Sequence, residues 1–152
     1  MFTFYYARGT CSLASHIALE QAGADYEALR IDFSAQMQSF NSYLCSTVHV
    51  AHSHRMRGYR WADDAAAIEA MQRKVPQSVG ECFHLIEREM LAVPWVLGEQ
   101  YTVCDMYLFT LSQWLEGDGV EIDRLPKVAD HRRRMAEDPV VAKVLAVELQ
   151  DS

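Results

Sequence analysis

The sequence of 152 residues lacks the marks of a secreted or membrane-spanning protein. Its first residues show no basic region followed by an apolar run, and no stretch approaches the roughly 18 apolar residues that a membrane span needs. The four cysteines, Cys11, Cys45, Cys82 and Cys104, form no C-x-x-C pair, unlike a disulfide framework or a zinc ribbon. These absences predict a cytoplasmic protein with reduced thiols and no membrane partner.

Basic residues are also fewer than acidic ones. Fourteen Lys and Arg residues stand against 21 Asp and Glu residues, which gives a formal net charge of -7. Because phosphate groups are bound by basic surfaces, this balance argues against nucleic acid as a partner. Half of the residues are hydrophobic, so the chain is long enough for one or two small domains with a core.

The N-terminal stretch carries the clearest chemistry. Phe2 to Tyr6 has strand character, a short turn follows, and Cys11 and Ser12 open an amphipathic helical pattern. A thiol in the first turn of a helix lies where unpaired N–H groups and the positive end of the helix dipole stabilise a thiolate. The position therefore favours a nucleophile, and a buried, inert cysteine is the alternative.

A second strand follows the first helix. Gly23 supplies a natural helix stop, and Tyr26 to Ile31 has strand character. Strand, helix and strand predict one right-handed βαβ unit with parallel strands. Two strands do not make a stable sheet, yet no further strand signal follows Asp32. The sequence thus predicts an α+β protein in which the rest of the sheet is missing.

Helical spacing fills the remainder of the chain. We expect a partial N-terminal domain over 1–33 and an all-helical domain over 34–152. Within the second domain, Pro76 should kink a long helix. The expected helices run from about Ser34 to Tyr59, from Asp63 or Asp64 to about Leu91, and from near Thr102, Pro126 and Pro139.

A capping box is predicted at the third of these helices. Thr102 as N-cap accepts from the backbone N–H of Asp105, whose carboxylate reaches back to the N–H of Thr102. Tyr101 and Met106 are placed to pack around it. The helix that follows, through Trp114, is apolar nearly all round and should be the central buried helix.

A possible metal site lies on the first long helix. Cys45, His49 and His52 follow at spacings of four and three residues, which would place them on one helical face. His54 points away from His49, however, and no carboxylate lies nearby in sequence. We therefore predict no metal site.

Two basic clusters remain. Residues 54–61 form a basic and aromatic patch that could hold a carboxylate or phosphate. We favour a solvated helix end, whose cations interact with the negative end of the dipole. Arg132, Arg133 and Arg134 indicate an exposed face, with Glu137 and Asp138 close by.

Two motifs together carry a family resemblance. W-V-L-G-x-x-Y-T-x-x-D-x-Y-L-F, preceded by two long helices and by an N-terminal Y-Y-x-x-G-x-C-S, resembles the cytosolic glutathione transferase family, bacterial beta class. The resemblance implies a thioredoxin-like N-terminal domain that binds glutathione as co-substrate. It also implies an all-helical domain that shapes the second-substrate pocket, and a homodimer.

The resemblance also implies roles for single residues. Cys11 takes the place of the beta-class cysteine that forms a mixed disulfide with glutathione, and Asp105 that of the structural capping aspartate. The residues implied to act at the site are the catalytic Cys11, Tyr6 and Ser12, and the substrate-binding His49, Arg8 and Thr10.

The chain departs from the family after the second strand. Family members continue with a loop holding a cis Val-Pro pair, two antiparallel strands, and an acid-Ser turn at a third helix. The Val-Pro backbone pairs with the cysteinyl part of glutathione and the acid-Ser pair binds its γ-glutamyl end. None of this lies between Asp32 and Met37, and the Val75-Pro76 and Val93-Pro94 pairs belong to the helical half. On the order of 40 to 60 residues are missing.

Two explanations compete for this gap. In a genuine deletion, another chain or rearranged helices must cover the strand edges. Alternatively, residues on either side of the gap are joined from separated segments of a longer polypeptide. We favour the deletion, and an intact mass well above 17.3 kDa would contradict it.

The predicted function is thiol-dependent. Either Cys11 exchanges with glutathione disulfide, or Tyr6 and Ser12 hold the glutathione thiolate for attack on a hydrophobic electrophile. The alternative is a noncatalytic dimeric binding module that keeps the glutathione transferase architecture but no longer binds glutathione.

Overall fold

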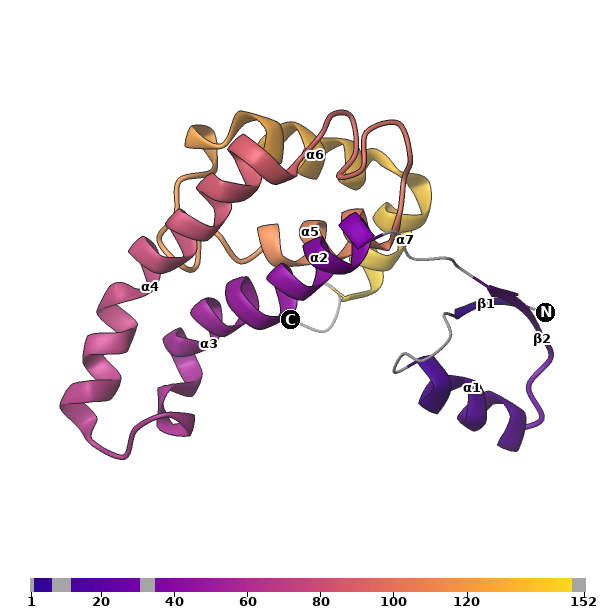
Figure 1. Ribbon diagram of the computed structural model, residues 1–152, viewed down its shortest axis with the longest axis horizontal. Helices are drawn as coiled ribbons and strands as arrows, with labels where there is room; N and C mark the ends of the chain where they lie inside the picture. Colours follow the sequence, from indigo (N-terminus) through magenta and orange to yellow (C-terminus); the bar gives the residue numbers. More distant parts are fainter. Residues whose placement is uncertain (1, 7–11, 31–34, 149–152) are drawn as a thin grey trace. The chain divides into compact units, whose positions relative to one another are not determined.

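The computed structural model describes residues 2–6, 12–30 and 35–148. The chain divides into two compact units, Met1–Gln38 and Ser39–Ser152. The first unit holds the strands and the second holds most of the helices (Figure 1).

The N-terminal unit is a single βαβ motif. Strand β1 (Phe2–Tyr6), helix α1 (Ser12–Gln21) and strand β2 (Tyr26–Arg30) follow in order, and the two strands pair in parallel. Gly23, at φ +60°, ends the helix, and its N–H donates to the carbonyl of Glu20 at 3.1 Å. The predicted two-stranded unit is therefore confirmed, and β1 and β2 are the only strands among the described residues.

The first long helical segment contains a wider turn than predicted. It runs through α2 (Ala35–Tyr43), a π-helical turn η1 (Leu44–Val48), α3 (His49–Arg57) and a short 3₁₀ turn η2 (Gly58–Arg60). Such π turns insert one extra residue and so rotate the helix face that follows. Helical periodicity alone gives no signal for this insertion.

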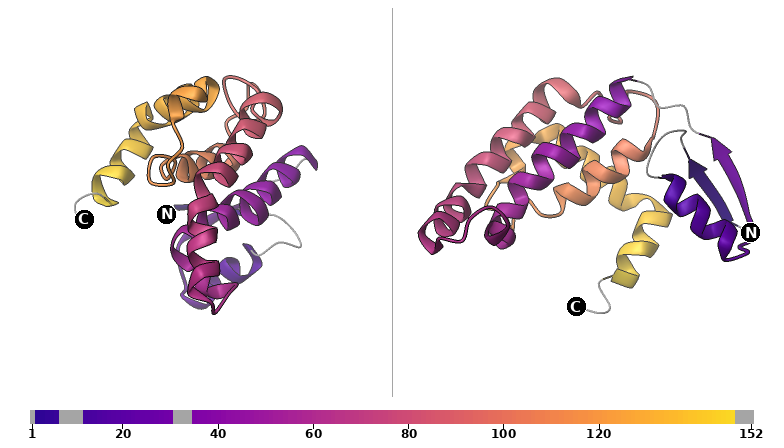
Figure 2. Two further views of the ribbon diagram at one scale, coloured as in Figure 1. Left: turned by 90° about the vertical axis from the view of Figure 1, so that its left-hand side faces the viewer. Right: turned by 60° about the horizontal axis from the view of Figure 1, so that its bottom comes forward.

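The second long segment contains the predicted proline. Helix α4 (Ala65–Leu85) continues into a second π turn, η3 (Ile86–Met90), and Asp64 caps it by accepting from the N–H of Ala67 at 2.8 Å. Pro76 lies inside α4, whose axis bends along its length (Figure 1). Helices α3 and α4 lie side by side in all views (Figure 2).

The remaining helices enclose the core. They are α5 (Val103–Ser112), the 3₁₀ turn η4 (Ile122–Arg124), α6 (Pro126–Glu137) and α7 (Pro139–Glu148). Helix α5 is central as predicted, since Cys104 and Leu108 on it are fully buried. It ends at Ser112, two residues before Trp114.

The architecture is a shortened thioredoxin-like βαβ unit followed by an all-helical domain, and the α+β prediction is confirmed. Among the described residues, no helix has both the length and the apolar character that crossing a bilayer requires.

Candidate functional site

The predicted site residues of the N-terminal unit lie around the β1–α1 connection. Tyr6 is the last residue of β1 and Ser12 the first of α1. Cys11, Arg8 and Thr10 lie outside the described residues.

An aromatic cluster joins α1 to the sheet beside Tyr6. The ring of His16 lies 5.2 Å from the rings of both Phe4 and Tyr6 and 5.8 Å from that of Tyr26, between centroids. Sequence reasoning did not single out His16, although its place four residues after Ser12 puts it on the same helical face. The cluster fixes the helix that Ser12 opens.

The hydroxyl of Tyr26 in this cluster bonds to the carboxylate of Glu20. That hydrogen bond, with smaller contributions from burial and from the carboxylate charge, raises the pKa of Tyr26 to about 12. The phenol therefore stays protonated at neutral pH.

His49 lies in the helical unit, at the start of α3. Its Nδ1 atom is 3.4 Å from the hydroxyl of Tyr107, and its ring centroid is 5.3 Å from that of Trp114. Partial burial, followed by the charges of His52 and Arg57, lowers the pKa of the His49 imidazole. At neutral pH the ring is therefore neutral.

His52 is held by a buried carboxylate that sequence reasoning missed. Its Nδ1 atom lies 2.7 Å from Oδ2 of Asp118, and Nη1 of Arg55 lies 3.3 Å from Oδ1 of the same side chain. Asp118 is only 3% exposed. It comes 66 residues after His52, so no local pattern could have paired them. Arg55 is thus not part of a freely solvated helix end.

The candidate metal ligands do not converge. Within the part of the chain that the structure describes, no three His, Cys, Asp or Glu side chains are grouped to hold a metal ion. His54 packs against Trp61, with ring centroids 4.6 Å apart, and Cys45 is exposed.

A cavity of about 280 Å³ lies beside His49 and His52. Trp114 forms one wall, where the ring of His52 stacks on it at 4.2 Å between centroids and 23° between planes. The lining is cationic and aromatic, and it comprises His49, His52, Ser53, Arg55, Met56, Arg57 and Trp114.

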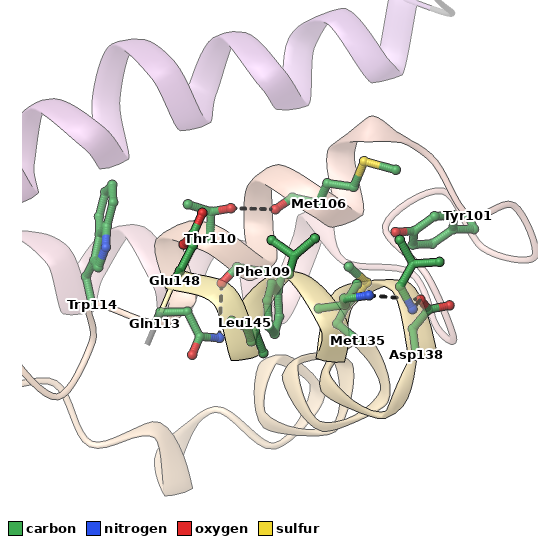
Figure 3. A pocket seen from close by; sticks show the side chains of 13 residues that line it. Tyr101, Met106, Phe109, Thr110, Gln113, Trp114, Met135, Asp138, Leu145 and Glu148 are labelled. Atoms are coloured by element: carbon green, nitrogen blue, oxygen red, sulfur yellow. Dashed lines mark hydrogen bonds between the residues drawn. The ribbon is translucent and has the colours of Figure 1, made fainter. Parts of the chain in front are cut away.

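A larger cavity, of about 570 Å³, lies between α5 and α7. Figure 3 shows Trp114 at one end of it and Tyr101 at the other, with Phe109 and Leu145 between them. Its surface is mostly apolar, so it suits an apolar group. Trp114 lines both cavities.

Asp105 organises the start of α5 rather than either cavity. It is fully buried, and its carboxylate accepts from the backbone N–H groups of Val96 and Thr102, each at 2.8 Å, and pairs with Nε2 of His131 at 3.0 Å. The N–H of Cys104 donates to the Thr102 hydroxyl at 3.2 Å, and both bonds of the capping box are present. His131 was missed because it comes 26 residues later.

The arginines of α6 correct the prediction of an exposed face. Arg134 is only half-exposed, donates to the carbonyl of Pro94 at 2.6 Å and lies over the ring of Trp95, 5.4 Å from its centroid. Arg132 pairs with Glu116 at 2.6 Å. Arg133 alone is largely exposed, and it pairs with Asp130 and Glu137 on its own helix.

No protein-family model matches the chain. The glutathione S-transferase GstA of Escherichia coli O157:H7 is 21% identical, with 95% of this chain and 97% of that protein covered. The alignment extends over 195 positions, which is 43 more than the 152 residues of this chain. At least that many positions of the alignment have no counterpart here.

Solved structures give a stronger match. A glutathione transferase homologue from Sulfitobacter, solved with bound glutathione, is 30% identical, with 96% of this chain and 97% of that chain covered and a TM-score of 0.74. The beta-class glutathione S-transferase of Sphingomonas chungbukensis is 19% identical, with 96% and 98% covered and a TM-score of 0.61. The second likeness shows the fold alone.

A shortened thioredoxin-like βαβ unit followed by an all-helical domain matches the glutathione transferase fold of the Sulfitobacter homologue. At 30% identity over nearly the full length of the Sulfitobacter homologue, the chain belongs to the glutathione transferase family, in its bacterial branch.

Proposed function

We propose that the protein is a glutathione-dependent enzyme whose reacting thiolate, that of Cys11 or of bound glutathione, is held at the segment from Tyr6 to Ser12. The observation that carries the proposal is the match to the Sulfitobacter homologue, which was solved with glutathione. The β1–α1 connection supports it, because Ser12 opens a ten-residue helix whose N-terminus favours an anion.

Cys11 directly precedes Ser12 in the sequence. As a thiolate it attacks the glutathione sulfur of a disulfide between glutathione and another thiol, forms a mixed disulfide with glutathione and releases the other thiolate. A glutathione thiolate then attacks the mixed disulfide, regenerates the Cys11 thiolate and leaves as glutathione disulfide. Tyr6 and Ser12 supply hydroxyl donors to the sulfur, and Arg8 and Thr10 contact the tripeptide.

Conjugation is the other branch of the proposal. There the glutathione thiolate, held by the Tyr6 or Ser12 hydroxyl, attacks a hydrophobic electrophile, which is a detoxifying reaction. His49, which matches a histidine of beta-class members, contacts the second substrate. We propose in addition that the protein is cytoplasmic and forms a homodimer.

Calorimetric titration with glutathione tests binding. Heat at or below millimolar ligand is expected, and its absence in folded protein would overturn the enzymatic proposal. Cys11→Ala should abolish disulfide exchange and spare conjugation. Cys45→Ala is the matched control, because Cys45 is an exposed thiol in the helical unit.

A noncatalytic dimeric binding module is the second candidate. It is favoured by the alignment with GstA, in which at least 43 positions have no counterpart here. A folded dimer by light scattering that gives no heat with glutathione would support this candidate.

A further inference from the structure

The sheet of the N-terminal unit has an open edge on each side. Strand β1 pairs with β2 along its whole length, from Phe2 opposite Tyr26 to Tyr6 opposite Arg30. In the described part of the chain, no third strand extends this sheet. An open edge presents a row of backbone N–H and C=O groups, and a two-stranded sheet is only marginally stable in water. A further strand at either edge would therefore stabilise the unit.

Charge distinguishes the two edges. Strand β2 contains Glu27 and Arg30, and charged side chains on an edge strand oppose pairing with another chain. Strand β1, with the sequence FTFYY, contains no charged residue, no proline and no glycine. Its aromatic residues and its threonine are also among those that strands prefer. Of the two edges, that of β1 is thus the one suited to pairing with another strand.

One face of β1 is covered by α1 and the other is open. The rings of Phe4 and Tyr6 both contact that of His16 on α1. Because side chains alternate along a strand, Thr3 and Tyr5 lie on the opposite face. Both are exposed, Tyr5 to 59%. Helix α1 therefore holds β1 from one side and leaves its edge and its other face free for a partner.

Charge and symmetry favour a second copy of the chain as this partner. Each copy has a formal net charge of -7, so two copies repel one another except where uncharged surfaces meet. Strand β1 offers such a surface. Antiparallel pairing of two β1 strands about a two-fold axis sets Phe4 of each copy opposite Phe4 of the other, and Thr3 opposite Tyr5. An aromatic pair directly opposite across two strands is stabilising, and no like charges meet.

We propose that two copies of the chain associate through the open edges of their β1 strands, which pair antiparallel about Phe4. The product is one four-stranded sheet in the order β2-β1-β1-β2. The inference rests on the proposed homodimer and names its interface. A five-residue strand gives a small interface, so the association depends on concentration. Because β1 ends at Tyr6, the pairing also holds the strand that leads into the proposed thiolate segment.

A pair of charge variants tests the interface and its register. Sedimentation velocity of the whole chain, without glutathione, is measured between about 1 and about 200 µM. The wild-type mass should rise towards twice 17.3 kDa with concentration. Thr3→Lys combined with Tyr5→Lys sets lysine opposite lysine twice, and should weaken the dimer at least about tenfold. Thr3→Lys combined with Tyr5→Glu sets lysine opposite glutamate twice, and should restore the dissociation constant to within about threefold of wild type.

Two controls separate pairing from general effects. Ala14→Lys combined with Ala18→Lys adds two charges at exposed positions of α1, and should leave self-association unchanged. Hydrogen exchange of the wild-type chain gives a readout without substitution. Protection of the β1 amides should increase with chain concentration, whereas protection of the α4 amides should not.

The outcomes separate this interface from the proposed function. Equal self-association in the wild type and both β1 variants overturns the interface, even where a homodimer forms through another surface. Unchanged protection of β1 with concentration also overturns it, and shows that the edge is covered within one chain. Loss of association in both variants overturns the register about Phe4. Self-association that follows the charge pattern, without heat from glutathione, supports the interface and overturns the enzymatic proposal.

Discussion

The two units of the chain differ in how much they bury. In the N-terminal unit, helix α1 has no buried residue, and Leu13 and Ile17 on it are 62% and 49% exposed. In the helical unit, Leu44, Leu108 and Leu115 are fully buried. Because burial of apolar surface drives folding, the stability of the chain resides in the helical unit. Among its described residues, the unit that carries the proposed thiol has no comparable core of its own.

The helical unit also buries charge. Asp105, Asp118 and Glu87 are buried, and each carboxylate accepts hydrogen bonds from a distant segment or pairs with a cation there. A buried carboxylate is tolerated only where such partners offset its desolvation. These side chains therefore fix the arrangement of the helices as well as adding to their stability.

The largest effect is expected from Asp105→Ala. It leaves the N–H groups of Val96 and Thr102, and Nε2 of His131, without their acceptor in the core. We expect a loss of about 3–5 kcal/mol in the free energy of unfolding, measured by urea titration. Asp123→Ala, at an exposed position, should change it by less than about 0.5 kcal/mol. Similar losses in both variants would contradict the structural role of Asp105.

A pair of leucines compares the units directly. Leu115→Ala removes a fully buried side chain and should cost about 2–5 kcal/mol in the same titration. Leu13→Ala, at a side chain that is 62% exposed, should cost less than about 0.5 kcal/mol. If Leu13→Ala proved as costly as Leu115→Ala, the N-terminal unit would have a core that another chain completes.

The carboxylate of Glu87 is a buried charge at the N-terminus of α6, and its contribution to the free energy of unfolding can be measured. Its carboxylate accepts from the N–H groups of Lys127 and Val128 at 2.9 and 3.0 Å, in the first turn of α6. Glu87→Gln keeps the shape but removes the charge at the helix N-terminus, and should cost about 1–2 kcal/mol. The matched control is Glu89→Gln in the same turn, whose pairing with Arg88 is exposed and should be almost neutral.

The smallest effect is the pH dependence of His49. Its pKa is lowered in the folded chain, mainly by burial, so the unfolded chain binds more protons between that pKa and about 6.5. Stability is therefore unaffected by His49 above pH 6.5 and falls as pH decreases through this window. His49→Gln should flatten that slope, and an NMR titration should place the midpoint of His49 below 6.5. A midpoint above 6.5 would contradict the effect of burial.

The elements that the sequence predicted have local causes. Gly23 ends α1 through its left-handed backbone, Pro126 and Pro139 start α6 and α7, and the capping box uses residues three apart. Each signal lies within a few residues of the structure it specifies. The strands and most helix ends were predictable for this reason.

What the sequence did not predict depends on distant partners. His52 meets Asp118 and Glu87 meets α6 across 66 and 40 residues, and neither pair leaves a spacing pattern. The two π turns were also missed, because each adds a residue without changing which residues are apolar. The cavity beside Trp114 joins side chains of α3 to a residue far along the chain, so no local pattern predicts it.

The contact of Glu87 with α6 has a consequence for folding kinetics. It closes a loop of 40 residues that contains α5. Closing such a loop costs roughly 3 kcal/mol of chain entropy before any contact compensates for it. We therefore expect this contact to form late, after α5 has docked. Its loss should speed unfolding and leave the folding rate nearly unchanged, so Glu87 governs how long the helical unit stays folded.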